Sequence, residues 1–256
     1  MKLLIQSDDY GISKAQALGC LEAIRFGLLK NTGIFVNMPW FEECAELIKP
    51  YIGHIDLGID LNVSTGSPIL NSKIIPSLVQ KNGAFLTSSM NRALDNESNN
   101  FDHVNYDETY KEMDSQIQKY INYFDRLPDY LQGHAFETDT TKKVIKDLGN
   151  KYGIKDTNSI CEKYSMIESA YWYNQPITYD NQFKSSLKEY ILQDKEHLLE
   201  KEIACIVCHC GYVDRDLMDL SSYNIYRLND LYALTDNEVK DWIITNNVEL
   251  VTYKDI

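Results

Sequence analysis

Residues 3–11 read Leu-Leu-Ile-Gln-Ser-Asp-Asp-Tyr-Gly, a short apolar run that ends on two adjacent carboxylates, Asp8 and Asp9. The run has the length and composition of a buried β-strand. The next stretch, 13–26, repeats its apolar residues at close to helical spacing, which predicts a helix. A strand, a polar turn and a helix in this order are typical of a parallel α/β sheet.

The same alternation continues along the chain. Apolar runs predict further strands at 33–37, 55–63, 130–133, 203–209 and 248–253. Helical spacing predicts helices at 41–48, 106–124, 140–152 and 240–245, and the polar stretch 95–107 predicts an exposed loop. We therefore expect an α/β fold of mostly parallel strands, such as a (β/α) barrel. The 256 residues fit one large domain, 1–256, and two compact domains are the alternative.

The composition is that of a globular chain, with 44% hydrophobic and 25% charged residues. Asp and Glu number 38 against 25 Lys and Arg, and the net charge of −13 repels phosphate backbones and anionic lipids. Nucleic acids and membranes are therefore not expected as partners. No run approaches the roughly 20 apolar residues of a membrane span. Polar residues interrupt the N-terminus too early for a secretory leader, so we expect a cytoplasmic protein.

Six cysteines are few for this length and, without a leader, do not predict a disulfide framework. Half of them lie in Cys205-Ile206-Val207-Cys208-His209-Cys210. This run has two interpretations, a zinc knuckle or a buried strand with inward thiols. No second Cys/His pair with knuckle spacing occurs elsewhere in the sequence, so the buried strand is favoured.

The polar residues that could take part in catalysis or metal binding share one position, the C-terminal end of a predicted strand: Asp8, Asp9, Asp60, His134 and His209. In a (β/α) barrel these ends open on one face, where catalytic residues gather. We therefore expect residues that are remote in the sequence to meet in one site.

Each of these residues also has a plainer interpretation. An Asp at the end of the first strand can cap the following helix, and a lone histidine is more often structural than a ligand. Asp60 shares a strand face with Asn62 in an otherwise apolar run. A carboxylate buried there needs a metal ion or a cationic side chain, whereas an outward one on an edge strand would mean nothing. Two carboxylates and one imidazole suit Zn²⁺, Mn²⁺, Fe²⁺ or Co²⁺ equally.

The other histidines and one aromatic stretch carry weaker signals. His103 and His197 lie in charged stretches and are expected at the surface, and His54 is expected to start a loop. Tyr171-Trp172-Tyr173 lies in a loop-like stretch that could stack on a sugar and cover a cleft, although packing in the core is commoner.

Four motifs follow one another along the chain: Ser7-Asp8-Asp9-Tyr10-Gly11; Leu57-Gly58-Ile59-Asp60-Leu61-Asn62-Val63 with Gly66 and Pro68; Gly133-His134; and His209-Cys210-Gly211-Tyr212 with Ser222-Tyr223 and Arg227. In this order they resemble the motifs of the YdjC-like carbohydrate deacetylases. The resemblance implies a deviant (β/α) barrel related to polysaccharide deacetylases. It also implies a metal-dependent hydrolase that removes acetyl groups from N-acetylated amino sugars, typically short chitooligosaccharides, and it suggests a homodimer.

The resemblance also assigns roles, which are here carried over residue by residue. It implies that Asp8 is the general base and His209 the general acid. It implies one divalent metal ion, such as Mg²⁺ or Zn²⁺, with three ligands: Asp9, Asp60 and His134. The residues that would line the substrate site are Tyr10, Asn62 and Arg227. The ion would polarise the amide carbonyl, the base would take a proton from water, and the acid would protonate the departing amine.

The chain departs from the family pattern at several of these positions. Asp60 stands where the family usually has His, so the ligand set changes to Asp-Asp-His, which adds negative charge and favours harder ions. Ala135-Phe136-Glu137-Thr138 replaces a His-rich stretch, and Cys210 replaces a Pro. The alternative to an active enzyme is therefore a catalytically impaired member that binds a sugar or a regulatory ligand. A metallohydrolase of another kind, such as a phosphoesterase, is a third hypothesis.

Overall fold

One parallel sheet joins the two ends of the chain. The computed structural model describes residues 1–95, 102–164, 166 and 171–256. In this part the strands follow the order β4-β3-β2-β1-β5, with β6 also paired to β1. Every pairing between them is parallel. The strand bounds are β1 Lys2–Tyr10, β2 Asn31–Ile34, β3 Asp56–Leu61, β4 Leu131–Gly133, β5 Ile203–Cys208 and β6 Glu249–Val251.

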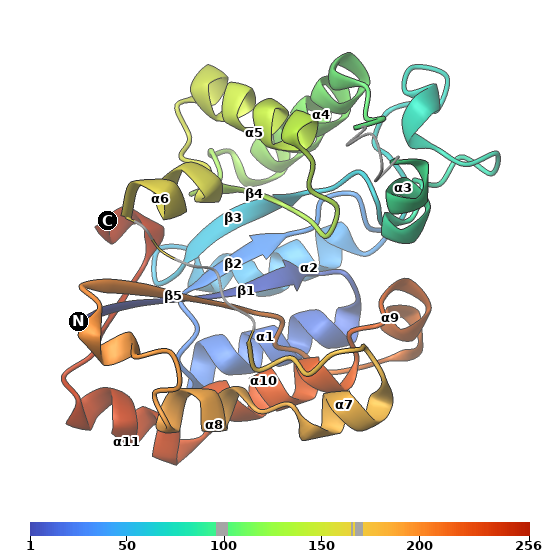
Figure 1. Cartoon of the computed structure of the whole chain (residues 1–256). Coiled ribbons are helices and arrows are strands. Elements are labelled where there is room, and N and C mark those ends of the chain that lie inside the picture. The colour runs from blue at the N-terminus through green and yellow to red at the C-terminus, as the bar shows by residue number, and fades with distance from the viewer. Residues whose placement is uncertain (96–101, 165, 167–170) are drawn as a thin grey trace.

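Helices cover both faces of the sheet (Figure 1). Helices α4, α5 and α6 lie on one side of it, and α1, α8, α10 and α11 lie on the other. The bounds are α1 Lys14–Phe26, α2 Phe41–Ile48, α3 Ser88–Leu94, α4 Tyr106–Phe124, α5 Asp139–Tyr152, α6 Thr157–Tyr164, α7 Tyr179–Lys184, α8 Leu187–Leu192, α9 Arg215–Leu220, α10 Ile225–Thr235 and α11 Asn237–Thr245. Short 3₁₀ helices complete the described part at Lys49–Tyr51, Pro76–Leu78, Leu198–Glu200 and Tyr253–Asp255.

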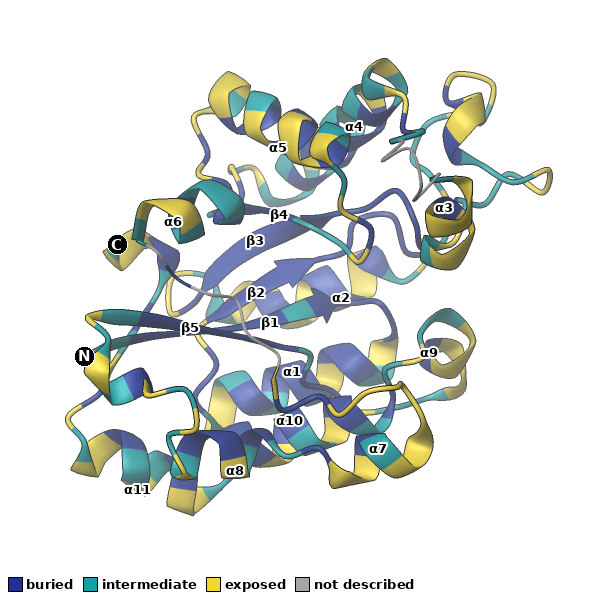
Figure 2. Cartoon of the chain, in the orientation of Figure 1, coloured by how far each residue is buried: buried dark blue, intermediate teal, exposed yellow. Residues whose placement is uncertain are grey.

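The two helix layers explain why the strands read as continuous apolar runs. A parallel sheet that is covered on both faces has no solvated face and needs no polar alternation. All six residues of β3 are buried, and Figure 2 shows the strands as buried ribbons between helices whose outer faces are exposed. The whole of β3 is enclosed in this way, which is what brings Asp60 into the interior.

The expected α/β fold of parallel strands is confirmed, with differences at the edges. Among the described residues no hydrogen-bonded strand pair joins β4 to β5 or β6, so strand pairing does not close the expected barrel there. The predicted helix 41–48 matches α2, whereas the predicted strand 248–253 ends early at Val251. It ends there because Thr252 caps a 3₁₀ turn. Residues 96–101 of the predicted loop 95–107 lie outside the described residues.

The cysteine-rich run forms the buried strand that the sequence favours. Cys205 and Cys208 lie within β5 and Cys210 follows it, all three are buried, and none is in a disulfide. None of the helices in the described part of the chain is both long and apolar enough to cross a membrane.

The first helix packs tightly on the loop that follows β5. A Cβ added to Gly19 of α1 would lie 2.4 Å from the backbone nitrogen of Tyr212 and 2.7 Å from Cα of Gly211. Backbone atoms cannot move aside as a flexible side chain can, so this contact requires glycine. The close approach fixes the position of the loop that carries His209.

Gly19→Ala is therefore expected to lower the free energy of unfolding by about 1–3 kcal/mol, the usual cost of overpacking. This cost exceeds the small gain in helix propensity from alanine. Urea unfolding followed by circular dichroism measures the change. Leu18→Ala is the matched control because Leu18, the preceding residue of α1, is 50% exposed. A stability equal to or above that of the wild type in Gly19→Ala would contradict the close contact.

Candidate active site

The end of β1 directs its two aspartates into different surroundings. The pairing of β1 with β2 shifts register between Ser7 and Tyr10, as in a β-bulge. Within this bulge Asp9 has a left-handed backbone, with φ of 71°. A non-glycine residue in this conformation is uncommon and such strain concentrates at functional sites. Asp8 lines a cavity, whereas the Asp9 carboxylate is buried beneath it.

Asp9 is the centre of a buried charged cluster. Its Oδ2 lies 2.6 Å from Nη2 of Arg227, and its Oδ1 lies 2.8 Å from Nδ1 of His134. Its backbone N–H donates to Oδ2 of Asp60 at 2.6 Å. Burial by itself would raise the pKa of Asp9, but the nearby His134 and Arg227 outweigh burial and hold this pKa well below its ordinary value.

Asp60 is the buried carboxylate that its apolar surroundings predict, and not an outward residue on an edge strand. It is 1% exposed and lies on β3, between β2 and β4. The side chain occupies the space above Gly33 of β2, where an added Cβ would lie 1.8 Å from Asp60 Oδ1. Burial, together with the charge of Asp9, raises the pKa of Asp60 to about 7. Oδ1 has no hydrogen-bond partner among the described residues.

Asp8 lies at a cavity of about 410 Å³ and is held by two amide side chains. Gln6 donates from Nε2 to Asp8 Oδ1 at 2.5 Å, and Gln132 donates from Nε2 to Oδ2 at 2.8 Å. The Tyr253 hydroxyl donates to Gln6 Oε1 at 2.5 Å, which fixes the orientation of that amide. Hydrogen bonds to both carboxylate oxygens fix the direction of the Asp8 side chain. The remaining lining residues are Arg92, Asp95, Gly133, Ala135, Phe136, Glu137, Thr157 and Asn158.

His209 follows β5 and is held from the side of α10. Its backbone N–H donates to Asp230 Oδ2 at 2.9 Å, and its ring Nδ1 lies 3.1 Å from the Tyr173 hydroxyl. Burial lowers the pKa of His209 to about 4, although the charge of Asp9 acts in the opposite direction. Burial raises the pKa of Asp230 to about 7, against the hydrogen bonds that its carboxylate accepts. The neutral imidazole is therefore the resting form of His209 at neutral pH.

The structure brings together most, but not all, of the predicted site residues. Asp9, Asp60, His134 and Arg227 form one cluster, with Asp8 beside it on β1. Tyr10 lies apart, because its hydroxyl donates to the backbone of Cys44 in α2. The Asn62 side chain bonds to the loop that it precedes: its Nδ2 donates to Thr65 O and its Oδ1 accepts from the Ser64 and Thr65 backbone N–H groups. As they stand, Tyr10 and Asn62 shape the walls behind the site and do not line the cavity.

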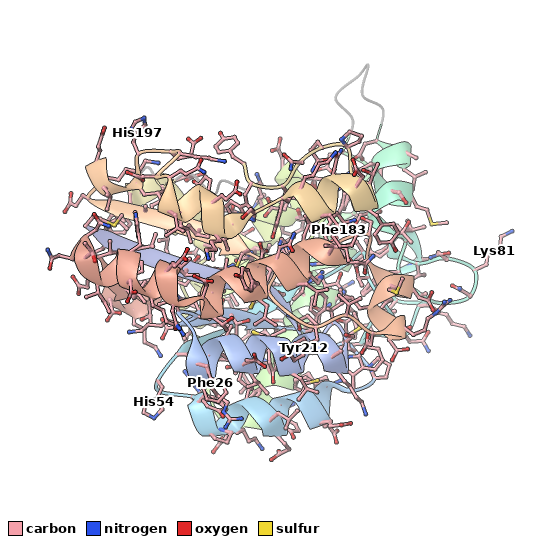
Figure 3. The ribbon with its side chains drawn as sticks, turned by 90° about the horizontal axis from the view of Figure 1, so that it is seen from below. Phe26, His54, Lys81, Phe183, His197 and Tyr212 are labelled. Atoms are coloured by element: carbon pink, nitrogen blue, oxygen red, sulfur yellow. The ribbon has the colours of Figure 1, made fainter. Side chains whose placement is uncertain are left out.

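The structure confirms one expectation about peripheral residues and corrects another. Trp172 and Tyr173 are 5% and 6% exposed and pack in the core, as is commoner for such residues, whereas Tyr171 is 66% exposed. The His103 side chain is 13% exposed and pairs with Asp95 at 2.6 Å, because a neighbouring carboxylate draws it inward. His54 and His197 do lie at the molecular surface, as Figure 3 shows.

Sequence reasoning missed three residues that contact the site, Gln6, Gln132 and Asp230, and it gave Tyr173 a different role, in sugar stacking or in the core. Weak signals for the three existed. Gln6 is the one amide within the apolar run of the first strand, Gln132 precedes Gly133-His134, and Asp230 stands three positions after Arg227. None of these signals indicates a partner. Gln6 lies two residues from Asp8, but Gln132 and Asp230 bond to residues 124 and 21 positions away.

The donor chemistry of the Asp9 cluster fits a divalent cation. The Asp9 carboxylate contacts the His134 imidazole, Asp60 accepts a hydrogen bond from the Asp9 backbone N–H, and Oδ1 of Asp60 has no hydrogen-bond partner among the described residues. Within the described residues no three His, Cys, Asp or Glu side chains form a ready-made metal arrangement. Asp9 forms an ion pair with Arg227 and contacts His134 instead, so ion binding would require the Asp9–His134 contact to open.

The raised pKa of Asp230 predicts a pH dependence of stability. Between about pH 4 and 7 the folded protein keeps a proton on Asp230 that the unfolded chain has released. The folded state binds more protons there, so the contribution of Asp230 to the free energy of unfolding falls as pH rises.

Asp230→Asn removes this dependence. We expect the free energy of unfolding of the variant, minus that of the wild type, to increase steadily from pH 4 to 7 and then to level off. Urea unfolding at a series of pH values with a chelator measures the difference. Asp241→Asn, an exposed change in α11, serves as the control and should give a flat difference. A flat difference for Asp230→Asn as well would show that Asp230 is ionised throughout this range.

Comparisons with known proteins cover the whole chain. A family model described as YdjC-like protein matches residues 2–245. Carbohydrate deacetylase 2 of Listeria innocua serovar 6a is 27% identical, with 100% of this chain and 99% of the relative aligned. A carbohydrate deacetylase of Clostridium beijerinckii is 27% identical over 100% of both chains.

Solved structures agree with this assignment. A protein of Enterococcus faecalis V583, assigned as a cellobiose-phosphate cleavage protein, superposes with a TM-score of 0.81 at 26% identity, over 99% of this chain and 98% of that one. A family 4 carbohydrate esterase of Streptomyces lividans, in complex with acetate, shares the fold alone, with a TM-score of 0.50 at 10% identity over 97% and 91% of the two chains. Since the family model spans nearly every residue, this chain belongs to the YdjC-like protein family.

Proposed function

We propose that this chain is a metal-dependent carbohydrate deacetylase that hydrolyses the acetamide of an N-acetylated amino sugar or short chitooligosaccharide. The observation that supports it most directly is Asp8, an oriented carboxylate at a cavity of about 410 Å³, beside the buried Asp9 cluster. Full-length relatives named carbohydrate deacetylases support the same activity. The cavity lies within the size range of small-molecule sites, and its polar lining suits sugar hydroxyls.

Asp9, Asp60 and His134 would hold the divalent ion. When bound, the ion would polarise the scissile carbonyl and favour deprotonation of the attacking water. Arg227 would hold Asp9 in place through their buried ion pair, and Gly33 would leave the space that Asp60 occupies. With a second carboxylate in place of an imidazole, the donor set favours harder ions such as Mg²⁺ or Mn²⁺.

The proton transfers are assigned to Asp8 and His209. Ionised Asp8, fixed by Gln6 and Gln132, would accept the proton of the attacking water as general base. His209 would deliver a proton to the departing amine. Because its pKa is lowered to about 4, it would have to take up that proton during the reaction. The predicted cytoplasmic location and the suggested homodimer stay predictions.

The ligand assignment predicts that Asp60→Asn lowers the bound divalent metal. Removal of one negatively charged oxygen ligand should reduce occupancy by at least tenfold under limiting metal, in line with the cost of altering ligand support. Mass spectrometry of protein dialysed against Mn²⁺, Mg²⁺ or Zn²⁺ measures the content. Asp56→Asn is the matched control, since Asp56 is also buried on β3 but at its opposite end. Unchanged metal content in Asp60→Asn and in Asp9→Asn would refute the assignment.

The activity itself is tested by acetate release from N,N′-diacetylchitobiose in the presence of each metal. Asp8→Asn should lower kcat by about 10²-fold or more, because general base catalysis contributes on this order. Asp107→Asn, an exposed change on α4, is the control.

The same assay separates the proposal from the two other hypotheses. Sugar binding by calorimetry without acetate release under any metal would identify an impaired member of the family that binds its ligand. Turnover of p-nitrophenyl phosphate in place of the acetylated sugar would identify a phosphoesterase.

A further inference from the structure

The polar contact of the His209 ring decides where its proton sits. Nδ1 lies 3.1 Å from the Tyr173 hydroxyl oxygen. A neutral imidazole carries one proton, on Nδ1 or on Nε2, and the hydrogen bond at one nitrogen selects between them. The direction of the Tyr173–His209 hydrogen bond therefore sets the tautomer of His209.

Asp230 determines that direction. The Tyr173 hydroxyl also donates to Oδ2 of Asp230. Asp230 is fully buried, and it accepts further hydrogen bonds from Trp172 Nε1 at 3.0 Å and from the His209 backbone N–H at 2.9 Å. An ionised carboxylate only accepts, and charge-assisted hydrogen bonds are stronger than neutral ones. The single Tyr173 proton is thus directed to Asp230, and a lone pair of the hydroxyl oxygen faces Nδ1.

Aromatic packing keeps Tyr173 in this position. Its ring lies 5.0 Å from Trp172 in an edge contact and 4.6 Å from Tyr226, between centroids. Tyr226 belongs to α10, the helix that also carries Asp230. The same helix therefore packs against the Tyr173 ring and supplies the acceptor for the Tyr173 hydroxyl proton. This arrangement keeps the hydroxyl within hydrogen-bond distance of Asp230.

We propose that Tyr173 is a positioning residue that fixes His209 as the Nδ1–H tautomer, with Nε2 unprotonated, by linking the His209 ring to Asp230. Tyr173 itself does not touch the reacting atoms. The tautomer follows from the hydrogen bonds that ionised Asp230 accepts, and only its catalytic meaning rests on the proposed function.

That meaning concerns the route of one proton. In the proposed hydrolysis the amide C–N bond breaks, a C–O bond to the water oxygen forms, and the leaving nitrogen gains a proton that water has lost. Asp8 takes the proton that the attacking water loses and returns it to solvent. His209 in this tautomer takes up a solvent proton at Nε2 and releases it to the leaving nitrogen from the same atom, so the protons balance. The Nδ1 proton stays on the ring, where the Tyr173 oxygen accepts its hydrogen bond and stabilises the transient imidazolium.

The tautomer is measurable by two-dimensional NMR on the full chain with ¹⁵N-labelled histidine, at about pH 8.5. This pH lies above the raised pKa of Asp230, which is about 7, so the carboxylate is ionised. The His209 signals are assigned by their loss in His209→Gln. We expect a protonated-type shift at Nδ1 and an unprotonated-type shift at Nε2. A protonated Nε2 in the wild type would overturn the proposal.

Two variants test the cause of the tautomer. Tyr173→Phe removes the acceptor and should shift at least half of the His209 population to Nε2–H. Asp230→Asn should have the same effect by another route, since its amide can donate to Tyr173 and turn the hydroxyl proton toward Nδ1. Retention of Nδ1–H in either folded variant would contradict the proposal, and Asp230→Asn carries the test if Tyr173→Phe does not fold.

Tyr223→Phe is the matched control. The Tyr223 ring also packs edge-on against His209, with centroids 5.3 Å apart, so the same substitution is made at a comparable distance. In Tyr223→Phe, His209 should have the same tautomer as in the wild type. If the wild-type protein releases no acetate, the proposed function is refuted but the NMR result for the tautomer still stands. Failure of the proposed function and failure of the tautomer proposal are therefore distinguishable.

Discussion

The site depends on one buried ion pair, between Asp9 at the end of β1 and Arg227 in α10. Both side chains are almost fully buried, and their charged atoms lie 2.6 Å apart. A buried charge without a partner would be strongly destabilising. The pair therefore ties the first strand of the sheet to a helix near the C-terminus, and it holds the carboxylate about which the other site residues are arranged.

This constraint accounts for the strained backbone beside it. The left-handed conformation of Asp9 is unfavourable in itself, yet in it the carboxylate reaches Arg227 and His134 while the backbone N–H reaches Asp60. The bulge also turns Asp8 away from its neighbour and toward the cavity. Two adjacent carboxylates thus acquire different environments, one buried and paired with cations, the other fixed by amide donors. Different environments are what allow like residues to take different chemical roles.

The carboxyl group of Asp60 lies next to Asp9. Burial and the Asp9 charge raise the pKa of Asp60 to about 7, so without an added cation this carboxyl is protonated more readily than an exposed Asp. A small residue at position 33 is necessary for it to fit at all. The glycine at position 33 of the neighbouring strand therefore makes room for Asp60.

The sequence by itself determined the parallel α/β sheet, because apolar runs separated by helical periodicity leave few other ways to bury both faces of the strands. It also placed Asp8, Asp9, Asp60, His134 and His209 at strand ends, but it left open whether Asp60 is buried or faces outward on an edge strand. Only the tertiary structure decided which groups pair with these residues. Arg227 on Asp9, Gln132 on Asp8, and Asp230 behind Tyr173 are contacts between segments far apart in the chain. The hydrophobic periodicity of the sequence does not predict such pairings. They are set by how the helices pack on the sheet and by the requirement that each buried polar group has a hydrogen-bond partner.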